Sequence, residues 1–386
     1  MSNTQTIENA HTSGVYAKRD LTIVRGEGAT LYDEDGNAYI DCVGGQGAAN
    51  LGHAHPKVVA AITEQAQKII SVPEMFYNDT RAALLERLTS LAPEGMDRAF
   101  LSNSGTEAVE AAFKFARFST KRTEIIATMR GFHGRSMGAL SATWNKKYRS
   151  PFQPLIPGIK HVPYNNLDKL DAAIDENTAA VILEAVQGEG GVYPGDADYL
   201  LGAQELCRER GALLIMDEIQ TGFGRTGKMF ALDHYDLQPD ILCVAKSIAG
   251  GVPMGATLLG ERVAELDKGI HGSTFGGNPL AAAASLAALN ALIDERLPER
   301  AAELGVYLVA ELQKIESPLI REVRGLGLMI GIEIKQKVAP YLKALTERGV
   351  LALPAGMTVL RLLPPLVIEK EQLDEAVAAI KEVLAE

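Results

Sequence analysis

A single lysine stands where the sequence passes from a buried apolar run to a glycine-rich turn. Lys246 follows the run 241–245 and precedes Ser247-Ile-Ala-Gly-Gly251. Partial desolvation lowers the pKa of a lysine amine, and such an amine can form a Schiff base with a carbonyl compound. A lysine that only reaches the surface after a strand has the same local pattern. Lys246 by itself therefore leaves both interpretations open.

An acidic residue ends the most apolar run of the chain. Asp217 follows the run 212–216, and a carboxylate there can pair with a buried cation such as a protonated pyridine nitrogen. A helix cap and a metal ligand are alternatives. The glycine-rich stretch 220–227 that follows has no second cluster of His or Asp residues. Metal binding is therefore the weaker of these alternatives.

The segment Ser102-Asn-Ser-Gly-Thr-Glu-Ala108 lies between a predicted strand and a predicted helix. Small residues let backbone N–H groups and hydroxyls approach an anion, and the helix dipole adds positive potential. Ser104, Gly105 and Thr106 are therefore candidates for binding a phosphate group. An ordinary capped helix, with Ser104 as N-cap and Glu107 three positions later, is the alternative. The absence of a GKS or GKT sequence argues against a nucleotide P-loop.

Four apolar runs indicate the elements that must position these residues. The runs cover residues 99–101, 179–183, 212–216 and 241–245. They are continuous rather than alternating, as in strands buried on both faces of a mostly parallel sheet, which predicts an α/β fold. Ligands of such sheets bind outside the carboxyl ends of the strands. Glu184, Asp217 and Lys246 lie at such ends, so we expect them to converge if the strands are neighbours.

The two ends of the chain have a different pattern and predict a smaller α+β domain. Residues 26–41 alternate around an Asp-Gly turn, which is a hairpin signal. The C-terminal part mixes predicted strands over 328–334 and 359–363 with predicted helices over 338–348 and 371–384. We therefore predict small-domain segments over 1–55 and 320–386, a large α/β domain over 56–280, and connecting helices over 281–319.

Composition and charge exclude several classes of function. The net charge is −11, so the chain lacks the basic footprint of a protein that binds nucleic acid or an anionic membrane. Cys42, Cys207 and Cys243 are too sparse for a disulfide framework or a zinc site, which predicts buried thiols in a reducing cytoplasm. Residues 1–12 have no signal-peptide pattern. The longest apolar stretch, 280–293, is too short to span a bilayer.

Nine short motifs follow one another in a fixed order along the chain. They are Gly36-Asn-Ala-Tyr-Ile-Asp41, Leu51-Gly-His-Ala-His-Pro56, Ser104-Gly-Thr-Glu-Ala108, Gly131-Phe-His-Gly-Arg135, Glu184 with Gln187-Gly-Glu-Gly190, Asp217-Glu-Ile-Gln220, Lys246, Ser273-Thr-Phe-Gly-Gly-Asn-Pro279 and Arg361-Leu-Leu-Pro-Pro365. Together they resemble the class III (ω-)aminotransferases, which depend on pyridoxal 5'-phosphate. The resemblance is strongest to the branch of acetylornithine aminotransferase and of the aminotransferase for carrier-protein-linked lysine (aminoadipate semialdehyde). It implies the fold type I architecture, with helices on both faces of a mostly parallel central sheet.

The resemblance assigns the cofactor to residues already noted. It implies that Lys246 binds pyridoxal phosphate covalently and carries a proton, and that Asp217 keeps the pyridine nitrogen protonated. The remaining implied contacts are Gln220 at the phenolic oxygen, Phe132 and Ile219 on the two ring faces, Ser104, Gly105 and Thr106 at the phosphate, and Thr274 at the phosphate of a neighbouring subunit. The last of these implies a homodimer with shared active sites.

The resemblance also assigns two arginines to substrate carboxylates. It implies that Arg135 holds the distal carboxylate in both half-reactions and that Arg361 holds the second carboxylate of 2-oxoglutarate. Glu189 would mask Arg361 while the donor is bound, because an unpaired cation beside the donor amine is unfavourable. Bidentate pairing with carboxylates explains the preference for arginine at both places. Tyr16 and Ser273 are further expected substrate contacts.

The implied enzyme moves the terminal amine of N2-acetylornithine or of carrier-linked lysine to 2-oxoglutarate by a ping-pong mechanism in arginine or lysine biosynthesis. Alternatives are an ornithine or 4-aminobutyrate aminotransferase, a pyridoxal-phosphate aminomutase, racemase or decarboxylase, and a non-catalytic binding protein. A small acidic carrier protein would be a partner, and Lys146, Lys147 and Arg149 form a basic cluster that could serve it or be a solvated face. By residue type alone, His133, Tyr16 and Glu184 are more typical of structural roles, and Glu184 could orient a neighbouring residue.

Overall fold

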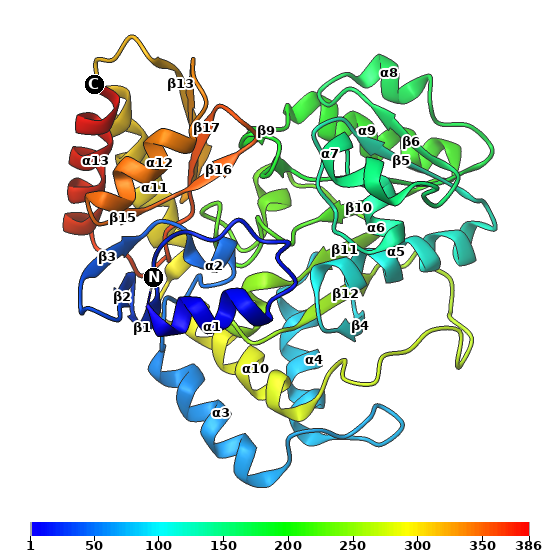
Figure 1. The fold of residues 1–386 in the computed structure, drawn as a ribbon. Coiled ribbons are helices and arrows are strands. Elements are labelled where there is room, and N and C mark those ends of the chain that lie inside the picture. Colours follow the sequence, from blue (N-terminus) through cyan, green and yellow to red (C-terminus); the bar gives the residue numbers. More distant parts are fainter. Residues whose placement is uncertain (1, 386) are drawn as a thin grey trace.

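Seven strands form the central sheet, in the order β4-β12-β11-β10-β7-β5-β6. The computed structural model describes residues 2–385 (Figure 1). The strands of this sheet are β4 (Arg98–Ser102), β5 (Glu124–Thr128), β6 (Ile159–Val162), β7 (Thr178–Leu183), β10 (Leu213–Asp217), β11 (Ile241–Val244) and β12 (Gly255–Leu259). Only β12 is antiparallel to its two neighbours, β11 and β4. The expected mostly parallel sheet is therefore confirmed.

Both faces of the sheet are buried, because the side chains of each strand alternate between two hydrophobic clusters. One cluster contains Val181, Leu183, Leu214 and Met216. The other contains Ala180, Ile182, Leu213 and Ile215, together with the apolar face of helix α5 (Gly105–Thr120). Helix α9 (Ala197–Arg210) packs on β10 and contributes Ala203 and Cys207 to the first cluster. This two-sided burial explains why the strands read as continuous apolar runs.

The other helices between residues 56 and 313 flank the central sheet or connect it to the C-terminal part of the chain. They are α3 (Pro56–Lys68), α4 (Asp79–Leu91), α6 (Met137–Ala142), α7 (Lys146–Arg149), α8 (Leu167–Asp171), α10 (Pro279–Asp294) and α11 (Leu297–Gln313), with short 3-10 helices η1 (Ser150–Phe152), η2 (Ala231–His234) and η3 (Lys246–Ala249). Helix α10 packs against α3 and α4, and ten of its 16 residues are buried, nine of them apolar, as expected for a core helix.

The ends of the chain meet in two smaller sheets on the left of Figure 1. One sheet joins β1 (Ile23–Glu27), β2 (Thr30–Asp33) and β3 (Ala38–Asp41) to β15 (Val350–Leu351), and the other has the order β13-β14-β17-β16. The second sheet comprises β13 (Ile320–Leu326), β14 (Met329–Ile334), β16 (Leu353–Ala355) and β17 (Val359–Leu362), with α12 (Ala339–Glu347) and α13 (Lys370–Ala385) beside it. The parallel pairing of β3 with β15 ties the two termini together, although the domain limits stay a prediction.

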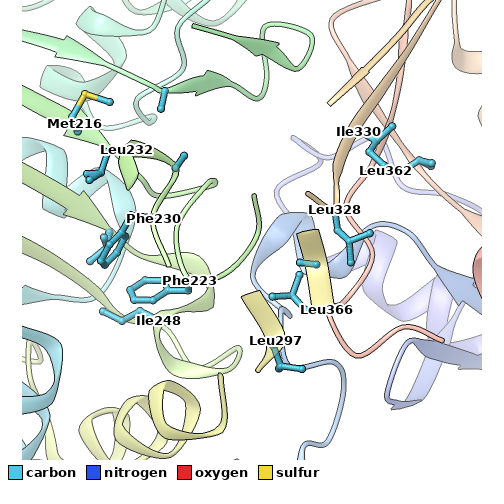
Figure 2. Packing of buried hydrophobic residues seen from close by; sticks show 14 of the residues in the cluster. Met216, Phe223, Phe230, Leu232, Ile248, Leu297, Leu328, Ile330, Leu362 and Leu366 are labelled. Carbon is cyan, nitrogen blue, oxygen red and sulfur yellow. The ribbon is translucent and has the colours of Figure 1, made fainter. Parts of the chain in front are cut away.

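A hydrophobic cluster connects the small sheets to the central one. Figure 2 shows Met216 and Phe230 on the side of the large domain, and Leu328, Ile330 and Leu362 on the side of the C-terminal sheet. Residues of one cluster therefore fix the C-terminal sheet against the carboxyl ends of the central strands.

The remaining elements are short. They are α1 (Asn3–His11), α2 (Gly44–Gly47), and a two-stranded hairpin of β8 (Val186–Gln187) and β9 (Tyr193–Pro194). The three cysteines are free and buried, as predicted. Within residues 2–385 no helix is both long and apolar enough to cross a membrane.

Candidate active site

The carboxyl ends of β7, β10 and β11 meet at one cavity. These strands are neighbours in the sheet, and Glu184, Asp217 and Lys246 all line a cavity of about 170 Å³. The convergence expected from the apolar runs is therefore confirmed. Among the residues assigned from the resemblance, those that line this cavity are Gly105, Thr106, Phe132, Glu189, Asp217, Ile219, Gln220 and Lys246.

Lys246 has a strained backbone and a free amine. Its φ of 48° lies in the left-handed region, which costs about 1–3 kcal/mol for a residue other than glycine and recurs at functional sites. Among the described residues none donates to or accepts from its amine in a hydrogen bond or ion pair. Burial lowers the pKa of the Lys246 amine; Glu189 opposes this effect and Arg361 adds to it. A lowered pKa increases the fraction of neutral, nucleophilic amine.

Asp217 is oriented by a histidine on the neighbouring loop. Its Oδ2 lies 2.7 Å from Nδ1 of His133, and its Oδ1 accepts from the backbone N–H of Ile219 at 3.1 Å. Burial opposes a charge on His133, but Asp217 and Glu184 outweigh it and raise the pKa of His133. The pair is almost fully buried. No group of three or more metal-ligating side chains exists among residues 2–385.

Glu184 connects two loops that border the cavity. Its carboxylate accepts from the backbone N–H of Phe132 at 3.0 Å and from that of Gly188 at 3.2 Å. Burial raises the pKa of Glu184 to about 7, although the nearby His133 lowers it in part. Glu184 therefore holds the aromatic residue and the start of the loop that carries Glu189.

The N-terminus of α5 lies at another part of the cavity. The hydroxyl of Ser104 caps the helix by accepting from Glu107 N at 3.3 Å, so this hydroxyl serves the cap. The oxygens of Thr106 and Ser136 lie 2.6 Å apart. A Cβ at position 105 would lie 2.9 Å from the side chain of Ile219, so glycine is required for Ile219 to approach the helix start. Gly105 and Thr106 therefore present first-turn N–H groups and a hydroxyl to an anion.

These residues fit pyridoxal phosphate. A helix N-terminus suits the phosphate, a buried carboxylate suits a protonated ring nitrogen, and a free amine of lowered pKa suits the aldehyde. The side chains of Phe132 and Ile219 in the same lining are apolar and suit the two faces of a flat ring.

Arg361 lies beside this cavity, at the C-terminal sheet. It is 2% exposed, and its Nη2 lies 2.7 Å from Oε1 of Glu189. Its Nη1 donates to Oε1 of Gln220 at 3.0 Å. Burial would raise the pKa of Glu189, but Arg361 and Lys246 outweigh it and leave that pKa below its usual value. A buried cation, a carboxylate and an amide thus form one connected group.

Arg135 lies at the rim instead. Its guanidinium carbon is 4.0 Å from the centre of the Tyr148 ring and 5.7 Å from that of Phe132. The side chain is exposed, and within residues 2–385 no carboxylate pairs with it. A stacked but unpaired guanidinium at this position can receive a carboxylate from solvent.

A second cavity of about 400 Å³ adjoins the first and shares Phe132 and Glu189 with it. Its lining includes the cations Arg130, Lys146 and Lys147. Glu189 is the one acidic residue of the described lining. The lining of the second cavity is therefore rich in basic and aromatic side chains.

The structure does not bring every assigned residue to these cavities. Tyr16 is exposed and lines a separate cavity beside α1. Ser273 accepts from the side chain of Asn103 at 3.1 Å, and Thr274 is exposed. Their assignments stay predictions, as does that of Ser104.

Sequence reasoning gave no functional role to His133, and it did not identify the second cavity. The position of His133 next to Phe132 was a signal, because adjacent residues of a loop can contact the face and the edge of one ring. The interleaving of Arg130, Lys146 and Lys147 with Trp144 and Tyr148 could have indicated the second cavity, but the loops that bring them together have no regular pattern.

Comparisons with known proteins agree with this geometry. The family model of class-III aminotransferases matches residues 13–384. A [LysW]-aminoadipate semialdehyde transaminase of Deinococcus radiodurans is 54% identical, over 98% of this chain and 89% of that protein. An acetylornithine aminotransferase of Methanothermobacter thermautotrophicus is 47% identical, over 96% of this chain and 95% of that protein. The crystal structure of an ornithine aminotransferase from Toxoplasma gondii superposes with a TM-score of 0.95 at 35% identity, over 99% of this chain and 94% of that one.

Proposed function

The chain belongs to the class III aminotransferase family, and from that premise we propose that it transfers the terminal amine of an N-blocked basic amino acid to 2-oxoglutarate. It is a pyridoxal-phosphate-dependent enzyme of fold type I. An aminomutase, a racemase, a decarboxylase or a non-catalytic protein would not require Arg361 to be paired with Glu189.

Three residues of the cavity handle protons in this proposal. Bound pyridoxal phosphate supplies an aldehyde that condenses with amines and a ring that accepts the electrons released when a proton leaves the adjacent carbon. The amine of Lys246, whose pKa burial lowers, would take up and return that proton. Asp217, 2.7 Å from His133, would keep a proton on the ring nitrogen.

The ion pair between Arg361 and Glu189 is the observation that carries the proposal. 2-Oxoglutarate has one carboxylate beside its reacting carbonyl and another at its far end, so it needs two cations. An N-blocked basic amino acid presents a terminal amine, and its carboxylate is remote. With that donor bound, an uncovered Arg361 would be a buried, unpaired cation. Glu189, at 2.7 Å, neutralises it and would yield to the acceptor's carboxylate.

The second cavity supports a donor with a large or anionic head. It shares the lining residues Phe132 and Glu189 with the cavity that contains Lys246, and Arg130, Lys146 and Lys147 also line it. The 54% identical relative is named for a LysW-linked substrate. We therefore propose that the enzyme also accepts lysine attached to a small acidic carrier protein, whose negative charge these cations would attract.

A kinetic panel tests the proposal. N2-acetylornithine, carrier-linked lysine, free ornithine and 4-aminobutyrate would each be combined with 2-oxoglutarate, and glutamate would be measured. We expect kcat/KM for at least one blocked donor to exceed that for ornithine and 4-aminobutyrate by about tenfold or more, which corresponds to about 1.4 kcal/mol. Equal kcat/KM values for blocked and unblocked donors, or no stoichiometric glutamate, would contradict it.

A homodimer is part of the proposal. Two neighbouring segments expose large apolar side chains, at Tyr77 and at Phe275. The buried Arg81 donates to the backbone oxygens of Phe76 and Gly277 at 3.0 and 2.8 Å, and so joins the two segments. A second copy covering this surface would receive Thr274 beside its own phosphate site. Sedimentation velocity should give a dimer, and a Tyr77→Glu variant should dissociate and retain less cofactor; a monomeric wild-type enzyme with full cofactor content would refute this.

We further propose a cytoplasmic location. Three buried thiols with no disulfide among residues 2–385 suit a reducing compartment. Cell fractionation with an antibody against the chain would test it, and recovery outside the cytoplasmic fraction would contradict it.

A further inference from the structure

The hairpin that carries Glu189 is held by more than its own two strands. In β8 and β9, Val186 pairs with Pro194 and Gln187 pairs with Tyr193, so Glu189 lies in the tip, residues 188–192. The tip reaches the C-terminal sheet, where β9 contacts β13 (Figure 1). A tip with only two paired rows behind it needs outside contacts to keep one position.

Arg324 of β13 provides such contacts. Its Nε donates to the backbone oxygens of Gly191 and Val192 at 3.1 and 3.0 Å, and its Nη2 donates to Gly191 O at 2.7 Å. Its Nη1 lies 2.8 Å from Glu333, and its guanidinium stacks on the Tyr193 ring at 3.9 Å. The planar fork of arginine suits this set of directions. Arg324 therefore binds the tip itself and not only an acidic neighbour.

Val192 marks the tip as a strained segment. Its φ is 56°, which is an outlier for a β-branched residue and costs about 1–3 kcal/mol unless the surroundings fix it. The side chain is fully buried. Its Cβ lies 3.0 Å from the place that a Cβ at position 331 would take. Gly331 of β14 therefore provides the slot into which Val192 packs.

The slot and both arginines lie in one row across the sheet. Arg324 is directly opposite Gly331 in the pairing of β13 with β14, and Gly331 is directly opposite Arg361 in the pairing of β14 with β17. Directly opposed residues project from the same face of a sheet. The hairpin tip thus lies along this row. The backbone oxygens of Gly191 and Val192 accept hydrogen bonds from Arg324, the Val192 side chain packs over Gly331, and Glu189 forms an ion pair with Arg361.

We propose that Arg324 and Gly331 are positioning residues that dock the hairpin tip where Glu189 covers Arg361, and so set how readily a substrate carboxylate displaces Glu189. The inference rests on the proposed function. Loss of the docking contacts lets the strained tip relax away from Arg361, so an incoming carboxylate meets less competition from Glu189.

Glutarate, an unreactive dicarboxylate of the same chain length as 2-oxoglutarate, reports on this competition without turnover. Its binding to the holoenzyme would be measured by isothermal titration calorimetry. We expect Arg324→Gln to tighten the Kd about three- to tenfold, and Glu189→Ala to tighten it more. In the double variant, Arg324→Gln should add nothing to Glu189→Ala, because both changes act on the same ion pair.

Arg321→Gln is the matched control. Arg321 Nη1 lies 3.0 Å from the same Glu333, but the side chain is largely exposed and makes no hydrogen bond or ion pair with hairpin residues 186–194. Its substitution should leave the Kd unchanged. A smaller change answers the question if Arg324→Gln fails to fold: the methyl of Gly331→Ala would crowd Val192. This variant should also tighten glutarate binding.

The outcomes distinguish a failure of this inference from a failure of the proposed function. Unchanged or weaker glutarate binding in Arg324→Gln, next to tighter binding in Glu189→Ala, overturns the docking role alone. The docking role is also overturned if Arg324→Gln tightens glutarate binding by the same factor in the presence and in the absence of Glu189. If no variant binds glutarate, Glu189→Ala included, the proposed function fails and this inference with it.

Discussion

The two arginines assigned to substrate carboxylates lie in different surroundings. Arg361 is 2% exposed and is bound by Glu189 at 2.7 Å and Gln220 at 3.0 Å. Arg135 is exposed and rests on the Tyr148 ring at 4.0 Å. The buried arginine has a carboxylate that can neutralise it, whereas the arginine at the rim has only an aromatic face. In the proposed function, Arg361 is therefore masked and unmasked in turn by Glu189, whereas Arg135 stays open to an anion.

The difference follows from the elements that carry the two residues. Arg361 belongs to β17, where the register with β14 and the docked hairpin fix its position. Arg135 belongs to a loop between β5 and α6, which has no regular pairing. A buried cation must be paired because desolvation penalises it, and an exposed cation is already solvated.

The largest effect tests the reaction centre that both arginines are proposed to serve. Lys246→Ala removes the amine of lowered pKa, so we expect steady turnover of a blocked donor with 2-oxoglutarate to fall about a thousandfold or more. Stopped-flow and steady-state assays would measure it. Steady turnover at the wild-type rate would mean that neither arginine acts on a reaction at Lys246.

The next largest effect tests whether Glu189 masks Arg361. Glu189→Ala leaves Arg361 unmasked, so substrates with an α-carboxylate beside the reacting amine should gain. We expect the ratio of glutamate turnover to terminal-amine turnover to rise about tenfold, a typical coupling between two sites. The two half-reactions would be followed separately by the cofactor's absorbance. An unchanged ratio would remove the distinction between a masked and an unmasked arginine.

The smallest effect concerns the carboxylate that supports the inner region. The pKa of Glu184 is raised to about 7 from an ordinary value of 4.5, so its contribution to stability is fully present below about pH 4.5 and is lost as the pH rises through about 7. Glu184→Gln has no such loss. The Tm of the variant minus that of the wild type should therefore rise by about 2–4 °C between pH 5 and pH 8. Differential scanning calorimetry would measure it, and a constant or falling difference would contradict the raised pKa.

Much of the large domain could be predicted from the sequence, because its strands are buried on both faces. The runs at 179–183 and 241–245 correspond to β7 and β11 within a residue at each end. Strands β5, β6 and β12 of the same sheet were not predicted. Strand β12 is the antiparallel member of the sheet, and Gly260 follows it, so no acidic or basic residue stands directly after its end.

The residues of the site could be predicted from the sequence, whereas the residues that position them could not. The motifs point to Lys246, Asp217 and Glu189, which indeed line one cavity. The hydrogen bond from His133 to Asp217 and the row from Arg324 to Arg361 depend on loops and strand registers. Such long-range contacts have no local pattern, because tertiary packing decides them.

The contrast between the two arginines is tested most directly by single-turnover measurements on Arg361→Gln and Arg135→Gln. With a blocked donor, Arg361→Gln should react at nearly the wild-type rate, but its reaction with 2-oxoglutarate should slow about a hundredfold, because charge-assisted hydrogen bonds to a carboxylate are lost. Arg135→Gln should slow both half-reactions by similar factors. If Arg361→Gln slows the donor half-reaction as much as the acceptor half-reaction, or Arg135→Gln slows only one of them, the two arginines do not divide the work as proposed.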